Sequence, residues 1–286
     1  MTLNHTHLIW DFNGTILQDV DLGIRCTNTM LSARNLAVIP SVEAYREVFG
    51  FPIDEYYRRM GFDFEKEDYD TVLAPEWVAM YMEGEPTCPM MEGAAEAIAA
   101  VKAMGIPQVL LSATEIDMLT GQLERLGIRG EFREVIGLDN IHARSKKAQA
   151  LAWKERNPDA RPLFVGDTLH DADVAAAVGG DCVLFCGGHQ SRARLEERGY
   201  PVIADIREIV RYLCSYRKTA DLPLKMGESA AFFVGGYMGV TGARGGKDRR
   251  GYMGVTGEKH PAVWQNGEFQ KRTKKPFTIS RILVIL

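Results

Sequence analysis

The sequence lacks long apolar runs and contains few cysteines. No apolar segment reaches the roughly 18 residues that a membrane-spanning helix needs, and the first residues, MTLNHTHLIWDF, lack the basic stretch and apolar core of a secretory leader. The five cysteines are odd in number and scattered, which disfavours a disulfide framework. We therefore expect a reduced, cytoplasmic protein without a membrane partner.

Positive charge is scarce over most of the chain and concentrated at its end. Residues 217–286 carry 13 Lys and Arg against 5 Asp and Glu, a net charge of +8, whereas residues 1–216 have a net charge of −12. The heptapeptide GYMGVTG occurs at 236–242 and again at 251–257, but two copies are too few for a repeat fold. A basic, Gly-rich segment is compatible with nucleic-acid binding, but this one fits a weakly ordered extension equally well. We expect residues 217–286 to be such a tail, without a specific nucleic-acid partner.

The middle of the chain alternates between two periodicities. Apolar runs typical of buried strands occur at 107–114, 161–168 and 181–186, with weaker ones at 132–137 and 200–205. Helical patterns lie at 91–105, 115–127, 145–157, 171–180 and 191–199. This alternation predicts an α/β fold with a Rossmann-like parallel sheet that is flanked by helices on both faces.

Residues 18–88 interrupt the alternation with helical spacing and little strand signal. Because this stretch follows the first strand directly, we expect it to form a helical cap over one edge of the sheet. The predicted organisation is an α/β core at 1–17 and 89–216, a helical cap at 18–88, and the basic tail at 217–286.

Three polar residues stand at the ends of predicted strands. The apolar run Leu8–Trp10 ends in Asp11, Ser112 ends the strand at 107–114, and Asp167 ends the strand at 161–168. Ligands of open parallel sheets bind at the carboxyl ends of the strands. The convergence of these residues on one edge therefore predicts a functional site there. Taken alone, each has a structural alternative, such as a turn at Asp11 or a helix N-cap at Asp171.

The motifs DFNGT at 11–15, Ser112, Lys146 in RSKKAQ, and GDTLHD at 166–171 together resemble the four motifs of the haloacid dehalogenase (HAD) superfamily. The insertion at 18–88 is similar to the cap of its phosphoglycolate-phosphatase-like branch. The resemblance covers residues 7 to about 214 and leaves out the tail. It implies Mg²⁺-dependent hydrolysis of a small phosphorylated metabolite through an aspartyl-phosphate intermediate. It names neither the metabolite nor the oligomeric state.

The resemblance also implies roles for individual residues. Asp11 would be the nucleophile, and Mg²⁺ would be held by the carboxylates of Asp11, Asp167 and Asp171 together with the backbone carbonyl of Asn13. Ser112 would bind a phosphoryl oxygen, and Lys146, with Lys147 as the alternative, would neutralise the transferred charge. The remaining phosphate contacts would come from Gly14, Thr15 and Ala113.

Asn13 departs from the pattern of this branch, which has a second Asp at this position. An amide cannot transfer a proton, and general acid–base catalysis is typically worth about 10²–10⁴-fold in rate. We therefore expect Asn13 to penalise poor leaving groups most, so that alkyl phosphates suffer more than aryl or acyl phosphates.

Two alternatives to a phosphatase remain open from the sequence. One is a catalytically weak phosphate-binding or regulatory protein. The other is a phosphonatase-type hydrolase, which would need a lysine in the cap, and no lysine precedes Lys66. Arg25, Arg58 and Arg59 are candidates to meet an anionic substrate, although surface positions suit them as well.

Overall fold

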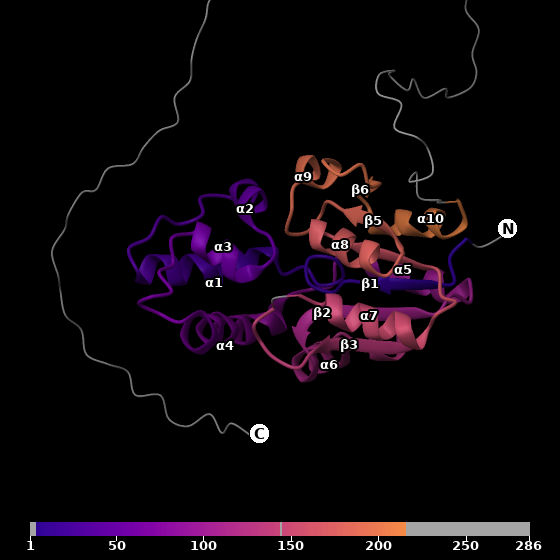
Figure 1. The fold of residues 1–286 in the computed structure, drawn as a ribbon, viewed down its shortest axis with the longest axis horizontal. Helices are drawn as coiled ribbons and strands as arrows, with labels where there is room; N and C mark the ends of the chain where they lie inside the picture. The colour runs from indigo at the N-terminus through magenta and orange to yellow at the C-terminus, as the bar shows by residue number, and fades with distance from the viewer. Residues whose placement is uncertain (1–3, 144, 216–286) are drawn as a thin grey trace, which may run out of the picture. The chain divides into compact units, whose positions relative to one another are not determined.

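The computed structural model describes residues 4–143 and 145–215, and within that range six parallel strands form one sheet in the order β3-β2-β1-β4-β5-β6 (Figure 1). The strands are β1 (His7–Trp10), β2 (Gln108–Glu115), β3 (Glu134–Leu138), β4 (Pro162–Gly166), β5 (Asp181–Phe185) and β6 (Val202–Ile203). The predicted parallel α/β sheet is therefore confirmed. The predicted tail, residues 217–286, lies outside the described residues.

Helices cover both faces of the sheet, because successive strand side chains point to opposite sides. Leu8 and Trp10 of β1 pack with α5 (Ala94–Ala103), α6 (Ile116–Arg125) and α10 (Ile209–Ser215) on one face. Ile9 packs on the other face with α7 (Lys147–Arg156), α8 (Leu169–Ala177) and α9 (Arg192–Glu196). Burial on both faces explains why the strands read as continuous apolar runs.

Local hydrogen bonds move two element boundaries away from the sequence prediction. Helix α8 begins at Leu169 rather than at 171, because Thr168 and Asp171 form a capping box one turn earlier. The segment predicted as a strand at 200–205 pairs with β5 over two residues, Val202–Ile203. Short 3₁₀ turns complete the core at Glu85–Thr87, Arg129–Glu131 and Ile206–Glu208.

The inserted segment is helical, as its spacing predicts. It contains α1 (Val20–Ala33), α2 (Val42–Val48), α3 (Ile53–Arg59), a π-helical turn (Tyr69–Leu73) and α4 (Ala74–Gly84). The π turn and α4 replace the single helix that the spacing at 68–83 suggests, and Pro75, which lacks an N–H, stands at the start of α4. These helices share a third apolar cluster, distinct from the two on the faces of the sheet. No helix of the described ranges has the length and apolar composition to cross a bilayer.

The first prediction concerns a hydrogen bond that fixes β1 against β2. Trp10 Nε1 donates to Gln108 Oε1 over 2.9 Å, and Gln108 Nε2 donates to the Ile98 carbonyl over 3.1 Å, all in the buried core. Replacing Gln108 with Leu leaves the buried N–H of Trp10 without an acceptor, and it also removes the side-chain donor to the Ile98 carbonyl inside α5. We expect the free energy of unfolding to fall by about 1–3 kcal/mol in urea denaturation.

The control is the double variant Trp10→Phe, Gln108→Leu. Because it removes the donor together with its acceptor, it should lose less than the sum of the two single changes. Strict additivity would contradict this role for the hydrogen bond.

Candidate active site

Three carboxylates meet at the carboxyl edge of the sheet. Asp11 follows β1, Asp167 follows β4, and Asp171 lies in the first turn of α8. One carboxylate oxygen from each lies within 4.8 Å of the other two. The structure thus brings together residues from both halves of the core, as the strand-end pattern predicts.

Lys146 lies among these carboxylates and is itself buried. Its Nζ makes a short ion pair with Asp11, lies 2.7 Å from Asp171 Oδ1, and donates to the Leu111 carbonyl over 3.0 Å. Lys147 begins α7 and is exposed. Of the two lysines that the sequence leaves open, Lys146 is thus the one that lies among the carboxylates.

Burial and crowding shift the pKa values of the three carboxyl groups. Burial raises the pKa of Asp11 well above its usual range; Lys146 opposes this shift, and Asp171 and Asp167 add to it. Burial likewise raises the pKa of Asp167 to about 6. For Asp171, burial opposes ionisation, but the ion pair with Lys146 prevails and holds its pKa below the usual value. A further cation at this edge would favour ionisation of all three groups.

The donor set suits a hard divalent cation. Clustered carboxylate oxygens are the ligands that Mg²⁺ prefers, and one lysine cannot balance three carboxylates. Asp171 is not the N-cap of α8, which is Thr168, but the acid of the capping box in the first turn: its Oδ2 accepts from Thr168 N and Oγ1, while its Oδ1 faces Lys146. Its two oxygens thus serve the helix cap and the cluster at the same time.

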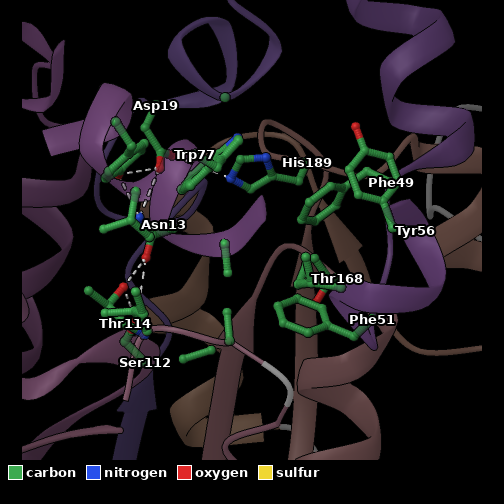
Figure 2. Close-up of a pocket in the computed structure, with 18 of the residues that line it drawn as sticks. Asn13, Asp19, Phe49, Phe51, Tyr56, Trp77, Ser112, Thr114, Thr168 and His189 are labelled. Atoms are coloured by element: carbon green, nitrogen blue, oxygen red, sulfur yellow. Dashed lines mark hydrogen bonds and ion pairs between the residues drawn. The ribbon is translucent and has the colours of Figure 1, made fainter. Parts of the chain in front are cut away.

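The side chain of Asn13 is fully engaged by protein groups (Figure 2). Its Nδ2 donates to Asp19 Oδ2 and to the Tyr81 hydroxyl, each over 2.8 Å. Its Oδ1 accepts from Thr114 Oγ1 at 2.7 Å and from Ser112 Oγ at 3.4 Å. The amide therefore acts as a fixed link between the cap residue Tyr81 and the end of β2.

Asp19 and His189 form a buried ion pair that the sequence analysis missed. His189 Nε2 lies 3.3 Å from Asp19 Oδ1, and His189 Nδ1 lies 2.8 Å from the Tyr45 hydroxyl. Burial alone would lower the pKa of His189, but the hydrogen bond and charge of Asp19 raise it to about 9. The pair therefore presents imidazolium and carboxylate at neutral pH. Thr114 and Tyr81 are further site residues that sequence reasoning did not identify.

In the sequence, the dipeptide Gly187-Gly188 is the one sign that the loop carrying His189 passes close to another side chain. A Cβ at Gly188 would collide with the Asp167 carboxylate, so glycine is required where the backbone passes this side chain. The backbone N–H of His189 then donates to Asp167. The glycines thus allow one loop to contact Asp167 through its backbone and Asp19 through a side chain.

Two predicted phosphate contacts have other partners in the structure. The Gly14 N–H donates to Asp19 Oδ1 over 2.8 Å and to the Leu17 carbonyl over 3.0 Å, so it does not point freely at a phosphate site. Thr15 Oγ1 donates to Asp167 Oδ1 over 3.2 Å and to Asp11 Oδ2 over 3.4 Å. Gly14 and Thr15 therefore order the carboxylates, whereas Ser112 and Ala113 line the cavity beside Asp11.

The fold and the site together define an α/β protein with a cluster of carboxylates at the edge of a parallel sheet, beneath a helical insertion. The family model of haloacid dehalogenase-like hydrolases matches residues 8–185. The chain belongs to this family of hydrolases.

Curated relatives carry a more specific name. A phosphoglycolate phosphatase of Pseudomonas syringae pv. syringae is 25% identical over 214 residues, which cover 71% of this chain and 78% of the relative. One from Pseudomonas fluorescens is 24% identical over 213 residues, with the same shares.

Solved structures share the fold at lower identity. A haloacid dehalogenase-like hydrolase from Streptococcus pneumoniae has a TM-score of 0.62 at 14% identity, covering 73% of this chain and 98% of that one. A predicted phosphoglycolate phosphatase from Haemophilus somnus has a TM-score of 0.60 at 18% identity, covering 74% and 99%. At these identities the likeness extends to the fold alone.

The second prediction tests the setting of Asn13. An Asp at position 13 would place a carboxylate against that of Asp19, and like charges at hydrogen-bond distance oppose each other. We expect Asn13→Asp to lower the free energy of unfolding at neutral pH by about 1–3 kcal/mol. Urea denaturation measures this loss.

The double variant Asn13→Asp, Asp19→Asn exchanges amide and carboxylate and so provides the control. The double variant should lose less free energy of unfolding than the sum of the losses in the two single variants, because an amide again faces a carboxylate. Additive losses would contradict the coupling of positions 13 and 19.

Proposed function

We propose that this hydrolase is a Mg²⁺-dependent phosphatase that cleaves a small phosphate monoester through an aspartyl-phosphate at Asp11. The observation that carries the proposal is the position of Asp11 at the end of β1, between Lys146 and the pair Asp167 and Asp171, where it lines the cavity. The name of the curated relatives supports the same reaction class. The scattered cysteines are compatible with the cytoplasmic setting that we propose with it.

In the proposed reaction, an Asp11 oxygen attacks phosphorus and the ester oxygen departs with the bonding electrons. Lys146 stabilises negative charge on the phosphoryl group, and Ser112 is placed to donate to one of its oxygens once released from its present partners. When bound by Asp11, Asp167, Asp171 and the Asn13 carbonyl, Mg²⁺ supplies charge neutralisation and fixes the phosphate relative to Asp11.

Asn13 supplies neither a proton for the leaving group nor a base for the attacking water. Its hydrogen bonds to Tyr81, Asp19 and Thr114 hold it as a structural link. The hydrolysis of the aspartyl-phosphate therefore lacks general-base help, which typically contributes about 10²–10⁴-fold. With a good leaving group, we expect this second step to limit the overall rate.

The phosphonatase alternative requires a cap lysine beside the substrate. Lys146 is the only lysine among the described residues that line the cavity, and it pairs with Asp11 and Asp171. Lys66 is exposed and pairs with Asp63 over 2.7 Å. This arrangement favours the phosphatase.

The third prediction is a rapid initial burst of product release, followed by slower turnover. Mixing the protein with p-nitrophenyl phosphate and Mg²⁺ in a stopped-flow instrument should release about one equivalent of p-nitrophenolate per protein chain, followed by slower turnover. Asp11→Asn should lose both phases, whereas Asp21→Asn, which changes an exposed carboxylate on α1, should keep them.

Mass spectrometry of acid-quenched protein should place the phosphoryl group on Asp11. A burst without later turnover would favour the weak phosphate-binding alternative. Activity that survives in Asp11→Asn would refute the proposed nucleophile.

The fourth prediction concerns metal binding without turnover. Saturating Mg²⁺ should raise the melting temperature by about 5 °C or more, because a ligand that binds only the native state stabilises it. The shift should largely disappear in Asp167→Asn and persist in Asp21→Asn, as measured by differential scanning calorimetry. An equal shift in all three proteins would place the metal elsewhere.

A further inference from the structure

The cavity above Asp11 has predominantly aromatic and aliphatic walls. It encloses about 150 Å³ between the sheet edge and the inserted helices. The apolar side chains of its wall come from α2, α3, α4 and their connections, and they include Tyr45, Phe49, Phe51, Tyr56, Trp77 and Val78. Figure 2 shows Phe49, Phe51, Tyr56 and Trp77 around the space that Asn13 and Ser112 border from the other side.

The cations that line this cavity already have anionic partners. Among the described lining residues, the cationic side chains are Lys146, paired with Asp11 and Asp171, and His189, paired with Asp19. Glu115 also lines the cavity, and its carboxylate accepts from the backbone N–H groups of Asp117 and Met118 at the start of α6. Among the wall residues that the structure describes, a second negative charge on the substrate would thus find no unpaired cation, and burying an unpaired charge is strongly unfavourable.

The arginines considered from the sequence lie elsewhere. Arg58 stacks over the ring of Phe64 at 4.1 Å, and Arg59 donates to the Val48 carbonyl over 3.1 Å. Arg25 is exposed, and none of the three arginines belongs to the cavity wall. They therefore do not supply the cation that a substrate carboxylate would need.

The size and the ring geometry of the cavity suit one aromatic ring. Trp77 and Tyr81 stack with centroids 4.8 Å apart, and Phe51 stacks on His170 at 4.5 Å. An apolar cavity of about 150 Å³ in another protein accepts benzene, and here the cavity also extends over Asp11 and Lys146, where the phosphate would lie. Aromatic walls also favour aromatic ligands through offset and edge-to-face contacts.

Asn13 points to the same substrates for an independent reason. A phenol has a pKa of about 10, as in the tyrosine side chain, whereas water, to which alkyl alcohols are close, has a pKa of about 15.7. A phenolate therefore leaves without the proton donor that Asn13 cannot provide. It takes its proton from solvent after release, and water then cleaves the aspartyl-phosphate to return Asp11 and inorganic phosphate.

We infer that the substrate is the phosphate monoester of a small, uncharged phenol rather than of a hydroxy acid. This inference rests on the proposed phosphatase function and specifies the leaving group at the same site. It gives this chain a different substrate from phosphoglycolate, for which its curated relatives are named.

The test compares phenyl phosphate with 2-phosphoglycolate in the full-length protein with Mg²⁺. We expect kcat/KM to be higher for phenyl phosphate on the order of 10²-fold, because the second substrate buries an unpaired carboxylate. In calorimetry without turnover, phenylphosphonate should bind more tightly than phosphonoacetate.

A lysine placed in the cavity wall should change the preference. Val78→Lys should shift the ratio of kcat/KM toward 2-phosphoglycolate by about fivefold or more, since it supplies the missing cation. Val38→Lys adds the same charge at an exposed position outside the wall and should leave the ratio unchanged.

Each contrary result has a distinct meaning. A preference of the native protein for 2-phosphoglycolate would overturn the inference but leave the phosphatase intact. The absence of Asp11-dependent phosphate release from either ester would instead refute the proposed function.

Discussion

The site depends on how a small, buried volume accommodates more negative than positive charge. Asp11, Asp167, Asp171 and Asp19 bring four carboxylates to one edge of the sheet, and Lys146 and His189 bring two cations. Burying unbalanced charge is costly unless a group takes up a proton or a counter-ion binds. Burial raises the pKa values of Asp11 and Asp167, and the neighbouring carboxylates add to this rise against the opposing effect of Lys146 and His189. The same imbalance is the physical reason to place a divalent cation there.

The same constraint accounts for Asn13. A carboxylate at this position would be a fifth negative group, in contact with Asp19 and with no further cation among its hydrogen-bond partners. An amide can donate to Asp19 and Tyr81 while accepting from Thr114, so it satisfies every neighbour without adding charge. The amide at position 13 and the Asp19–His189 pair are thus two parts of one arrangement.

The strand-end residues were predictable because their positions follow from local sequence. Apolar runs that end in Asp11, Ser112 or Asp167 fix both the strand and the edge at which the side chain emerges. Asp19 and His189 were not predictable in this way, since they are 170 positions apart and meet only through tertiary packing.

The residues of the cavity wall could not be predicted from the sequence for a similar reason. Its rings come from several short helices whose mutual packing decides which of them face Asp11. Helical spacing identified those helices but could not choose between wall and surface for residues such as Arg58 and Arg59. Gly187-Gly188 was the best available sign that the backbone of this loop passes close to a side chain, here that of Asp167.

The loop at 187–190 contacts both Asp167 and the helix that supplies part of the cavity wall. Arg46 of α2 donates to the carbonyls of Gly187 and Gly188, each over 2.8 Å, and Gln190 Nε2 donates to the Phe49 carbonyl over 3.2 Å. The helix that supplies Tyr45 and leads into Phe49 is therefore held by the loop whose His189 N–H contacts Asp167. A displacement of α2 would disturb the aromatic wall and the support of Asp167 together. The position of the aromatic wall and the support of Asp167 thus depend on one set of hydrogen bonds around the loop at 187–190.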